Sequence, residues 1–213
     1  MILLLIMLII ISPGVDRYVS VIPYDQIGNR FYGENDQWSK VIYHLVPWIT
    51  VFMVLFPISL LVWSKIKHDE RQFRQAKRFS IIVLLSLILG PGLLVNTIFK
   101  SNWGRARPYQ VLRDGKIFTP VWQANFRLKN QHSFSSGHAA IGFFLGVPLL
   151  ALGKKRVAVI LSVAGGLIVG GVRILQGGHY LTDVLFSGIF VWLVAWLVIY
   201  FTDKWIIKKV GSE

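Results

Sequence analysis

The chain has 213 residues, of which 54% are hydrophobic and none is cysteine, and its formal net charge is +13. So much apolar sequence, arranged in blocks, is typical of a polytopic, all-α membrane protein, and we expect residues 1–213 to form one domain. The lack of cysteine excludes disulfides, a thiol nucleophile and Cys-ligated metals. The basic residues flank the apolar blocks, which argues against nucleic acid as a partner and favours lipids with anionic head groups.

Residues 1–12 form an apolar run that ends at Pro13-Gly14. The run is shorter than the roughly 20 residues that a spanning helix needs, so we expect a short first span, with an interfacial anchor as the alternative. Residues 15–43 mix charged and aromatic side chains. That mixture is typical of a segment lying along the head groups, although a solvated loop would look similar.

Five further apolar blocks follow, and with the first run they predict a bundle of about six transmembrane helices. They cover residues 45–64, 79–99, 136–153, 157–172 and 184–201. Gly90-Pro91-Gly92 inside the second block predicts a kink. The spacing of Gly166 and Gly170 in the fourth predicts close helix packing.

Six spans would place the loops at 65–78 and 154–156 and the basic tail on one side of the membrane. The loops at 15–43, 100–135 and 173–183 would lie on the other side. Counts of Lys and Arg are nearly equal on the two sides, but the first side concentrates them in very short loops. The positive-inside rule therefore predicts that the first side is cytoplasmic and that the long polar loop faces outward.

Three groups of polar residues lie on the predicted outward side. The first is RILQGGHYLTD, residues 173–183, where Arg173, His179 and Asp183 lie at or near the ends of apolar segments. Charge there is costly and suggests function, with a buried ion pair between helices as an equally good interpretation. A histidine oriented by a carboxylate, beside a permanently charged arginine, suits a phosphate ester.

The second group, KSNWGRARP at residues 100–108, contains Lys100 and Arg107, which could hold phosphate oxygens or only extend to lipid head groups. The third group is SFSSGHAA, residues 133–140, at the start of an apolar block. There Ser136 is a plausible helix cap, Gly137 would let an anion approach the backbone, and His138 would lie in the first turn.

Together the three groups contain what phosphoryl transfer without a metal or cofactor requires. His179 would be the nucleophile, Asp183 the residue that orients it, and His138 the general acid and base. The phosphate would be bound by three cations and one helix start, namely Lys100, Arg107, Arg173, Ser136 and Gly137. The remaining acids are scattered, so no zinc or magnesium site is expected.

In order and spacing these motifs resemble the type 2 phosphatidic acid phosphatase superfamily, over residues 79–201. The resemblance implies a phosphohistidine at His179, with His138 protonating the leaving group, in a membrane-embedded catalytic core. Ser135 stands where that family has proline, and Val172 where it has serine.

Within the family, NWGRARPYQV and residues 118–122 look most like bacterial lipid A phosphatases, and we expect the 1-phosphatase type, in the inner membrane with its site facing the periplasm. Phosphatidylglycerophosphate and undecaprenyl diphosphate are further expected substrates. The loop has seven basic residues that would suit a polyanionic head group: Lys100, Arg105, Arg107, Arg113, Lys116, Arg127 and Lys129. A lipid-to-lipid phosphotransferase and a non-catalytic transporter or scaffold are the alternatives, and the oligomeric state stays open.

Overall fold

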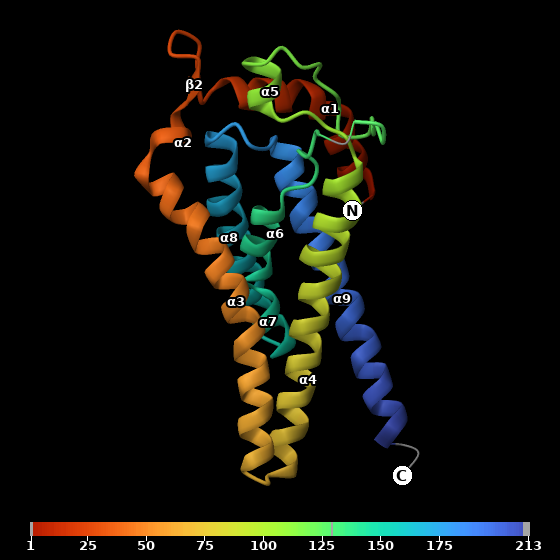
Figure 1. Ribbon diagram of the computed structural model, residues 1–213. Helices are drawn as coiled ribbons and strands as arrows, with labels where there is room; N and C mark the ends of the chain where they lie inside the picture. Colours follow the sequence, from red (N-terminus) through yellow and green to blue (C-terminus); the bar gives the residue numbers. More distant parts are fainter. Residues whose placement is uncertain (1, 129, 211–213) are drawn as a thin grey trace.

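Long helices run side by side along most of the molecule, and short elements cover one end of them (Figure 1). This computed structural model describes residues 2–128 and 130–210. The described elements are α1 (Ile2–Val21), β1 (Tyr24–Asp25), β2 (Arg30–Phe31), α2 (Tyr32–Asn35), α3 (Gln37–Ile66), α4 (Glu70–Leu87), η1 (Ile88–Lys100), α5 (Pro108–Leu112), α6 (Gly137–Phe144), α7 (Val147–Ala151), α8 (Lys155–Leu175) and α9 (Leu181–Val210).

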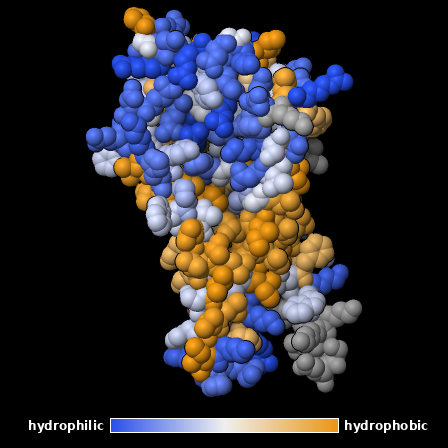
Figure 2. Space-filling model, viewed as in Figure 1, coloured by the Kyte–Doolittle hydropathy of each residue, from blue (hydrophilic) through white to orange (hydrophobic). Residues whose placement is uncertain are grey.

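Four helical segments of the described chain are long and apolar enough to cross a membrane: Gln37–Ile66, Glu70–Lys100, Lys155–Leu175 and Leu181–Trp205. The pair α6–α7, Gly137–Ala151, is apolar but shorter. An apolar belt crosses the middle of the face shown in Figure 2, between two polar ends. The predicted helical membrane protein is therefore observed, whereas the predicted count of six spans is not confirmed.

One part of the difference in span count comes from the short α6–α7 pair. The other part comes from α1, which lies across one end of the bundle (Figure 1). The helix continues through Pro13 to Val21, so the expected stop at Pro13-Gly14 is not observed. From residue 10 to residue 21, its buried side chains are polar and recur every fourth residue, at Ser12, Asp16 and Ser20, while Ile10, Ile11 and Tyr18 are exposed. A polar face toward the protein and an apolar face outward fit the interfacial anchor better than a span.

The expected kink at Gly90-Pro91-Gly92 takes the form of a π-helical stretch, η1, which continues α4 for 13 residues. Proline cannot donate the usual backbone hydrogen bond, so a wider helix is one way to continue past it. The side-chain Nδ2 of Asn96 donates to the backbone carbonyl of Pro91 at 2.7 Å and closes this turn. As a result Asn96 faces the start of α6, where it touches Gly137.

Helices α6 and α8 pack closely because glycines line their interface. A Cβ on Gly142 would lie 2.5 Å from the carbonyl oxygen of Gly165, and a Cβ on Gly165 would lie 2.6 Å from that of Gly142. Gly166 faces the ring of Phe143 in the same way. A Cβ on Gly170 would collide with Cγ1 of Val184 on α9, so the predicted packing role of Gly166 and Gly170 is observed. Gly171, by contrast, has no neighbour within 4 Å.

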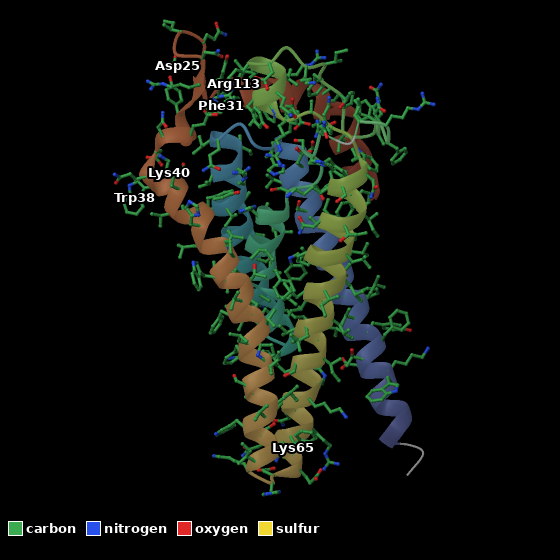
Figure 3. The ribbon with its side chains drawn as sticks, in the orientation of Figure 1. Asp25, Phe31, Trp38, Lys40, Lys65 and Arg113 are labelled. Carbon is green, nitrogen blue, oxygen red and sulfur yellow. The ribbon has the colours of Figure 1, made fainter. Side chains whose placement is uncertain are left out.

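The loops alternate between the two ends of the bundle. Lys65 lies at one end, and Asp25 and Arg113 lie at the other (Figure 3). The turn between α8 and α9 and the long loop before α6 share the end that carries Arg113 (Figure 1). All three predicted motif groups therefore meet at one end of the bundle.

The glycine interface yields a first prediction. Gly165→Ala should destabilise the protein by about 1–3 kcal/mol, because its new methyl group meets the backbone of α6 and overpacks the interface. The matched control is Gly171→Ala on the same helix, which adds a methyl group in open space. Thermal unfolding of both variants in detergent would test this, and equal melting temperatures would contradict it.

Candidate active site

The site is built around the N-terminus of α6, which begins deeper in the bundle than the nearby ends of α8 and α9 (Figure 1). Ser136 caps the helix, as expected, and its Oγ accepts from the backbone N–H of Ala139 at 3.4 Å. Both Ser136 and Gly137 are buried. The unpaired N–H groups of this first turn therefore point into the protein, where they favour an anion.

His179 lies in the turn after α8, and its side chain is almost completely buried. Its Nδ1 is 2.6 Å from the backbone carbonyl oxygen of Ser133. A carbonyl oxygen only accepts, so Nδ1 carries the proton and the lone pair is on Nε2. Burial lowers the pKa of His179 to about 4, so the ring is neutral near pH 7 and Nε2 can act as a nucleophile.

Asp183 orients His179 less directly than expected. Its Oδ2 lies 3.7 Å from Nδ1 of His179, close enough for electrostatic attraction but too far for a hydrogen bond. Instead Oδ2 accepts from the hydroxyl of Ser133 at 2.5 Å and from the backbone N–H of Tyr180 at 2.9 Å. Asp183 therefore acts on His179 mainly by holding Ser133, whose carbonyl binds the ring.

The three predicted phosphate-binding cations gather beside His138. Lys100, Arg107 and Arg173 all lie close enough to repel positive charge on its ring, and so does His179. Among the residues that the structure describes, none of the three cations has a carboxylate within 4 Å, and the buried Nε of Arg173 has no partner. A cluster of positive charge without a counterion is suited to a dianionic phosphate.

Two glycines in the turn after α8 make this cluster possible. Gly177 has φ +62°, a conformation that favours glycine, and a side chain there would meet the ring of Phe31. A Cβ at Gly178 would collide with the guanidinium of Arg173. The turn therefore brings Arg173 and His179 to the same place, as the sequence suggested.

Tyr43 belongs to the site, although the sequence offered no signal for it beyond an aromatic residue near the head groups. Its ring stacks on His138 with centroids 4.3 Å apart and an angle of 16°. The guanidinium of Arg173 lies 4.9 Å from the centre of the same ring. Tyr43 therefore supports both residues from α3 and can stabilise positive charge on either.

The loop cations do not act as one group, contrary to the expectation of seven residues for a polyanionic head group. Arg105 is completely buried and bonded to Asp16 and Asp183. Arg113 pairs with Glu34 at 3.1 Å. Lys129 lies outside the described residues. Of the two arginines in GRARP, only Arg107 is thus available to phosphate, because Arg105 has acidic partners that are distant in sequence.

A cavity of about 430 Å³ opens from the site and runs between α3 and η1. Lys100, Gly137 and His138 lie at its polar part, and the rest of its lining is mainly apolar, including Val46, Val54, Leu87 and Ile141. No group of three or more His, Asp or Glu residues that could hold a metal occurs in the described part of the chain. The metal-free assignment remains a prediction.

Comparison with known proteins identifies the family. Residues 79–207 match the PAP2 superfamily. The chain belongs to this superfamily. The predicted superfamily is therefore confirmed, and with it the enzyme class, a phosphoric monoester hydrolase. No solved structure gives a significant match.

Two relatives of the PAP2 chain carry the name lipid A 4'-phosphatase. The protein of Francisella tularensis subsp. novicida is 34% identical over 195 residues, which cover 89% of the chain and 86% of the relative. That of Rhizobium etli is 34% identical over 149 residues, which cover 68% of the chain and 57% of the relative. The expected 1-phosphatase type thus has no support among these names. The motifs describe only the reaction centre, whereas the choice of phosphate depends on how the rest of a head group docks.

The buried His179 predicts a specific loss of stability in acid. Its pKa is about 4 in the folded protein against 6.5 for a free imidazole, so the unfolded chain binds more protons between these values. The stability is present above pH 6.5 and is lost as the pH falls from 6.5 to 4, by about 3 kcal/mol in total. In His179→Asn, whose amide can replace the Nδ1–H, this loss should be absent. The free energy of unfolding of both proteins, measured in detergent at pH 7.5, 5.5 and 4.5, would check this. The same dependence on pH in the two proteins would contradict it.

Proposed function

We propose that this PAP2 enzyme removes the 4'-phosphate of lipid A at the periplasmic face of the bacterial inner membrane. The observation that carries the proposal has two parts: His179 is neutral with its proton on Nδ1, and three cations gather beside His138 with no carboxylate of the described residues within 4 Å of them. Lys100 and His138 lie at the polar part of an apolar cavity. This arrangement suits a molecule that is a phosphate ester at one end and a hydrocarbon at the other.

The proposed reaction has two steps. In the first, Nε2 of His179 attacks phosphorus, an N–P bond forms, and the P–O bond to the sugar breaks. His138 becomes protonated when the bound phosphate offsets the charge of the three cations, and it gives this proton to the leaving oxygen. In the second, His138 takes a proton from water, which attacks phosphorus, and the N–P bond breaks to release inorganic phosphate. Lys100, Arg107 and Arg173 offset the charge that develops on the phosphoryl oxygens in both steps.

The Ser133 carbonyl supports the first step. When Nε2 binds phosphorus, the imidazole ring becomes positively charged, and its Nδ1–H donates more strongly to this oxygen. Tyr43, stacked on His138, helps to hold the protonated form of that ring. Tyr43 lies outside the three motif groups, and Ser133 is the first residue of the third group.

The lipid substrate and the position of the phosphate are supported by different observations. The cavity between α3 and η1 supports a substrate with hydrocarbon chains, because most of its lining is apolar and belongs to two helices that are long and apolar enough to cross a membrane. The names of the relatives support lipid A and its 4'-phosphate. The positive-inside pattern of the short loops supports the periplasmic orientation.

The decisive experiment measures inorganic phosphate released from two synthetic monophosphoryl lipid A molecules, one with the 4'-phosphate only and one with the 1-phosphate only. We expect release mainly from the 4'-phosphate form, and His179→Asn should lower it by about a thousandfold or more. The control is His68→Asn at the other end of the bundle, which should retain activity.

Each failure has its own meaning. Preference for the 1-phosphate form would overturn the proposed position, and faster release from phosphatidylglycerophosphate or undecaprenyl diphosphate would overturn the substrate. Loss of the lipid phosphate without free phosphate would indicate transfer to another lipid. Normal turnover in folded His179→Asn would exclude His179 as the nucleophile.

The metal-free assignment is tested separately. Activity should be unchanged by excess EDTA, because side chains alone supply the nucleophile, the acid and the positive charge. The measurement is the rate of phosphate release before and after dialysis against EDTA. A loss that added Mg²⁺ or Zn²⁺ reverses would contradict the assignment.

A further inference from the structure

A carboxylate on α1 is completely buried at the edge of the site. The side chain of Asp16 accepts three hydrogen bonds: from the backbone N–H of Thr182 at 3.0 Å, from the hydroxyl of Thr182 at 2.6 Å and from Nη2 of Arg105 at 2.8 Å. Asp16 lies outside the residues that match the PAP2 superfamily, which begin at residue 79. Nothing in the three motifs requires it.

Arg105 links Asp16 to the site. Its Nη1 donates to Oδ1 of Asp183 at 2.5 Å while its Nη2 donates to Asp16, so two carboxylates share one guanidinium. Its Nε donates to the carbonyl of Thr119 at 3.0 Å, and the ring of Tyr180 lies 4.3 Å from it. Because all three nitrogens of the planar guanidinium are hydrogen-bonded, the group has one fixed orientation. A displacement of Asp16 would therefore move Arg105 and, with it, Asp183.

From Asp183 the network reaches the proposed nucleophile in two further contacts. Asp183 accepts from the hydroxyl of Ser133, and the carbonyl of Ser133 accepts from His179. Each of these residues is at most 1% exposed. The chain of contacts is therefore shielded from water, and a displacement at Asp16 cannot be absorbed by solvent.

The charges give Asp16 a second effect on the site. Burial works against the charge on Arg105, but Asp183 and Asp16 outweigh it and raise the pKa of this arginine, which is always charged. Burial raises the pKa of Asp16, and Arg105 opposes this. With both acids ionised, the cluster carries one net negative charge near His179. Without Asp16, Arg105 would neutralise Asp183 and leave that charge at zero.

We propose that Asp16 is a positioning residue for the phosphatase reaction, which from α1 holds Arg105, Asp183 and Ser133 in the arrangement that orients His179 and supports its positive charge during phosphoryl transfer. This inference rests on the proposed role of His179. The competing interpretation is that Asp16 only attaches α1 to the bundle, as many buried ion pairs attach helices.

The first test compares Asp16→Asn with the matched control Asp25→Asn, which removes an acid from the nearby hairpin whose only ion-pair partner within 4 Å, among the described residues, is Arg30 at 3.7 Å. In Asp16→Asn we expect kcat to fall tenfold or more while KM stays within twofold, because the phosphate-binding cations are untouched. Asp25→Asn should match the unchanged protein. Equal kcat in all three proteins would overturn the inference.

A double variant separates positioning from attachment. If Asp16 acts through Asp183, Asp16→Asn combined with Asp183→Asn should be no more than about threefold slower than Asp183→Asn alone. If Asp16 only attaches α1, the two losses should multiply, and that result would overturn the inference.

A second variant tests the inference if Asp16→Asn cannot be studied. If Asp16→Asn does not fold, the isosteric Thr182→Val removes one donor from Asp16 and one acceptor from Arg105, and it leaves every buried charge paired. It should lower kcat about threefold at constant KM, and unchanged kcat would overturn the inference.

The last measurement needs no lipid. Orthovanadate, which mimics the phosphoryl group in transfer, should raise the melting temperature, and Asp16→Asn should need about tenfold more of it than Asp25→Asn. Equal requirements would overturn the inference even if lipid A proved not to be the substrate. If orthovanadate does not stabilise the unchanged protein, the anion site itself is wrong, and so are the inference and the proposed function.

Discussion

A buried imidazole can attack phosphorus only while it is neutral and only from the nitrogen that has no proton. The contact between His179 and the carbonyl of Ser133 meets the second condition, and burial of the ring inside the protein meets the first. Much of the surrounding structure serves this contact. Asp183 and Arg105 hold Ser133, and Gly177 and Gly178 let the turn place the ring beneath Arg173.

The arginines and the lysine of the site differ in whether acidic side chains neutralise their charge. Arg105 is stable in the interior because two carboxylates and a carbonyl satisfy its guanidinium, whereas Lys100, Arg107 and Arg173 lack acidic partners among the described residues. The first arrangement is typical of a scaffold and the second of a site whose counterion is the substrate. Two arginines only two positions apart, Arg105 and Arg107, therefore have different roles.

The cavity and helix α1 connect the site with the surfaces of the protein that are apolar. The cavity beside η1 begins at Lys100, Gly137 and His138 and continues between apolar side chains of α3 and η1. Helix α1 covers the end of the bundle that carries the site, with its polar face inward and its apolar side chains outward. A helix with this pattern can contact lipid and the catalytic network at the same time, which is why a residue as distant in sequence as Asp16 can influence His179.

The sequence by itself determined the helical blocks, the cap at Ser136, the glycine packing of α8 and the residues of the three motifs, because each depends on apolar periodicity or on spacing along a short segment. It could not determine the position of α1, since the apolar run at residues 2–12 is compatible with a span and with an interfacial helix alike. Nor could it show that Arg105 is buried, that Tyr43 stacks on His138 or that a backbone carbonyl orients His179. Those contacts join residues from 46 to 95 positions apart. Only the packing of whole helices brings such residues within hydrogen-bonding or stacking distance, and so only the tertiary structure decided them.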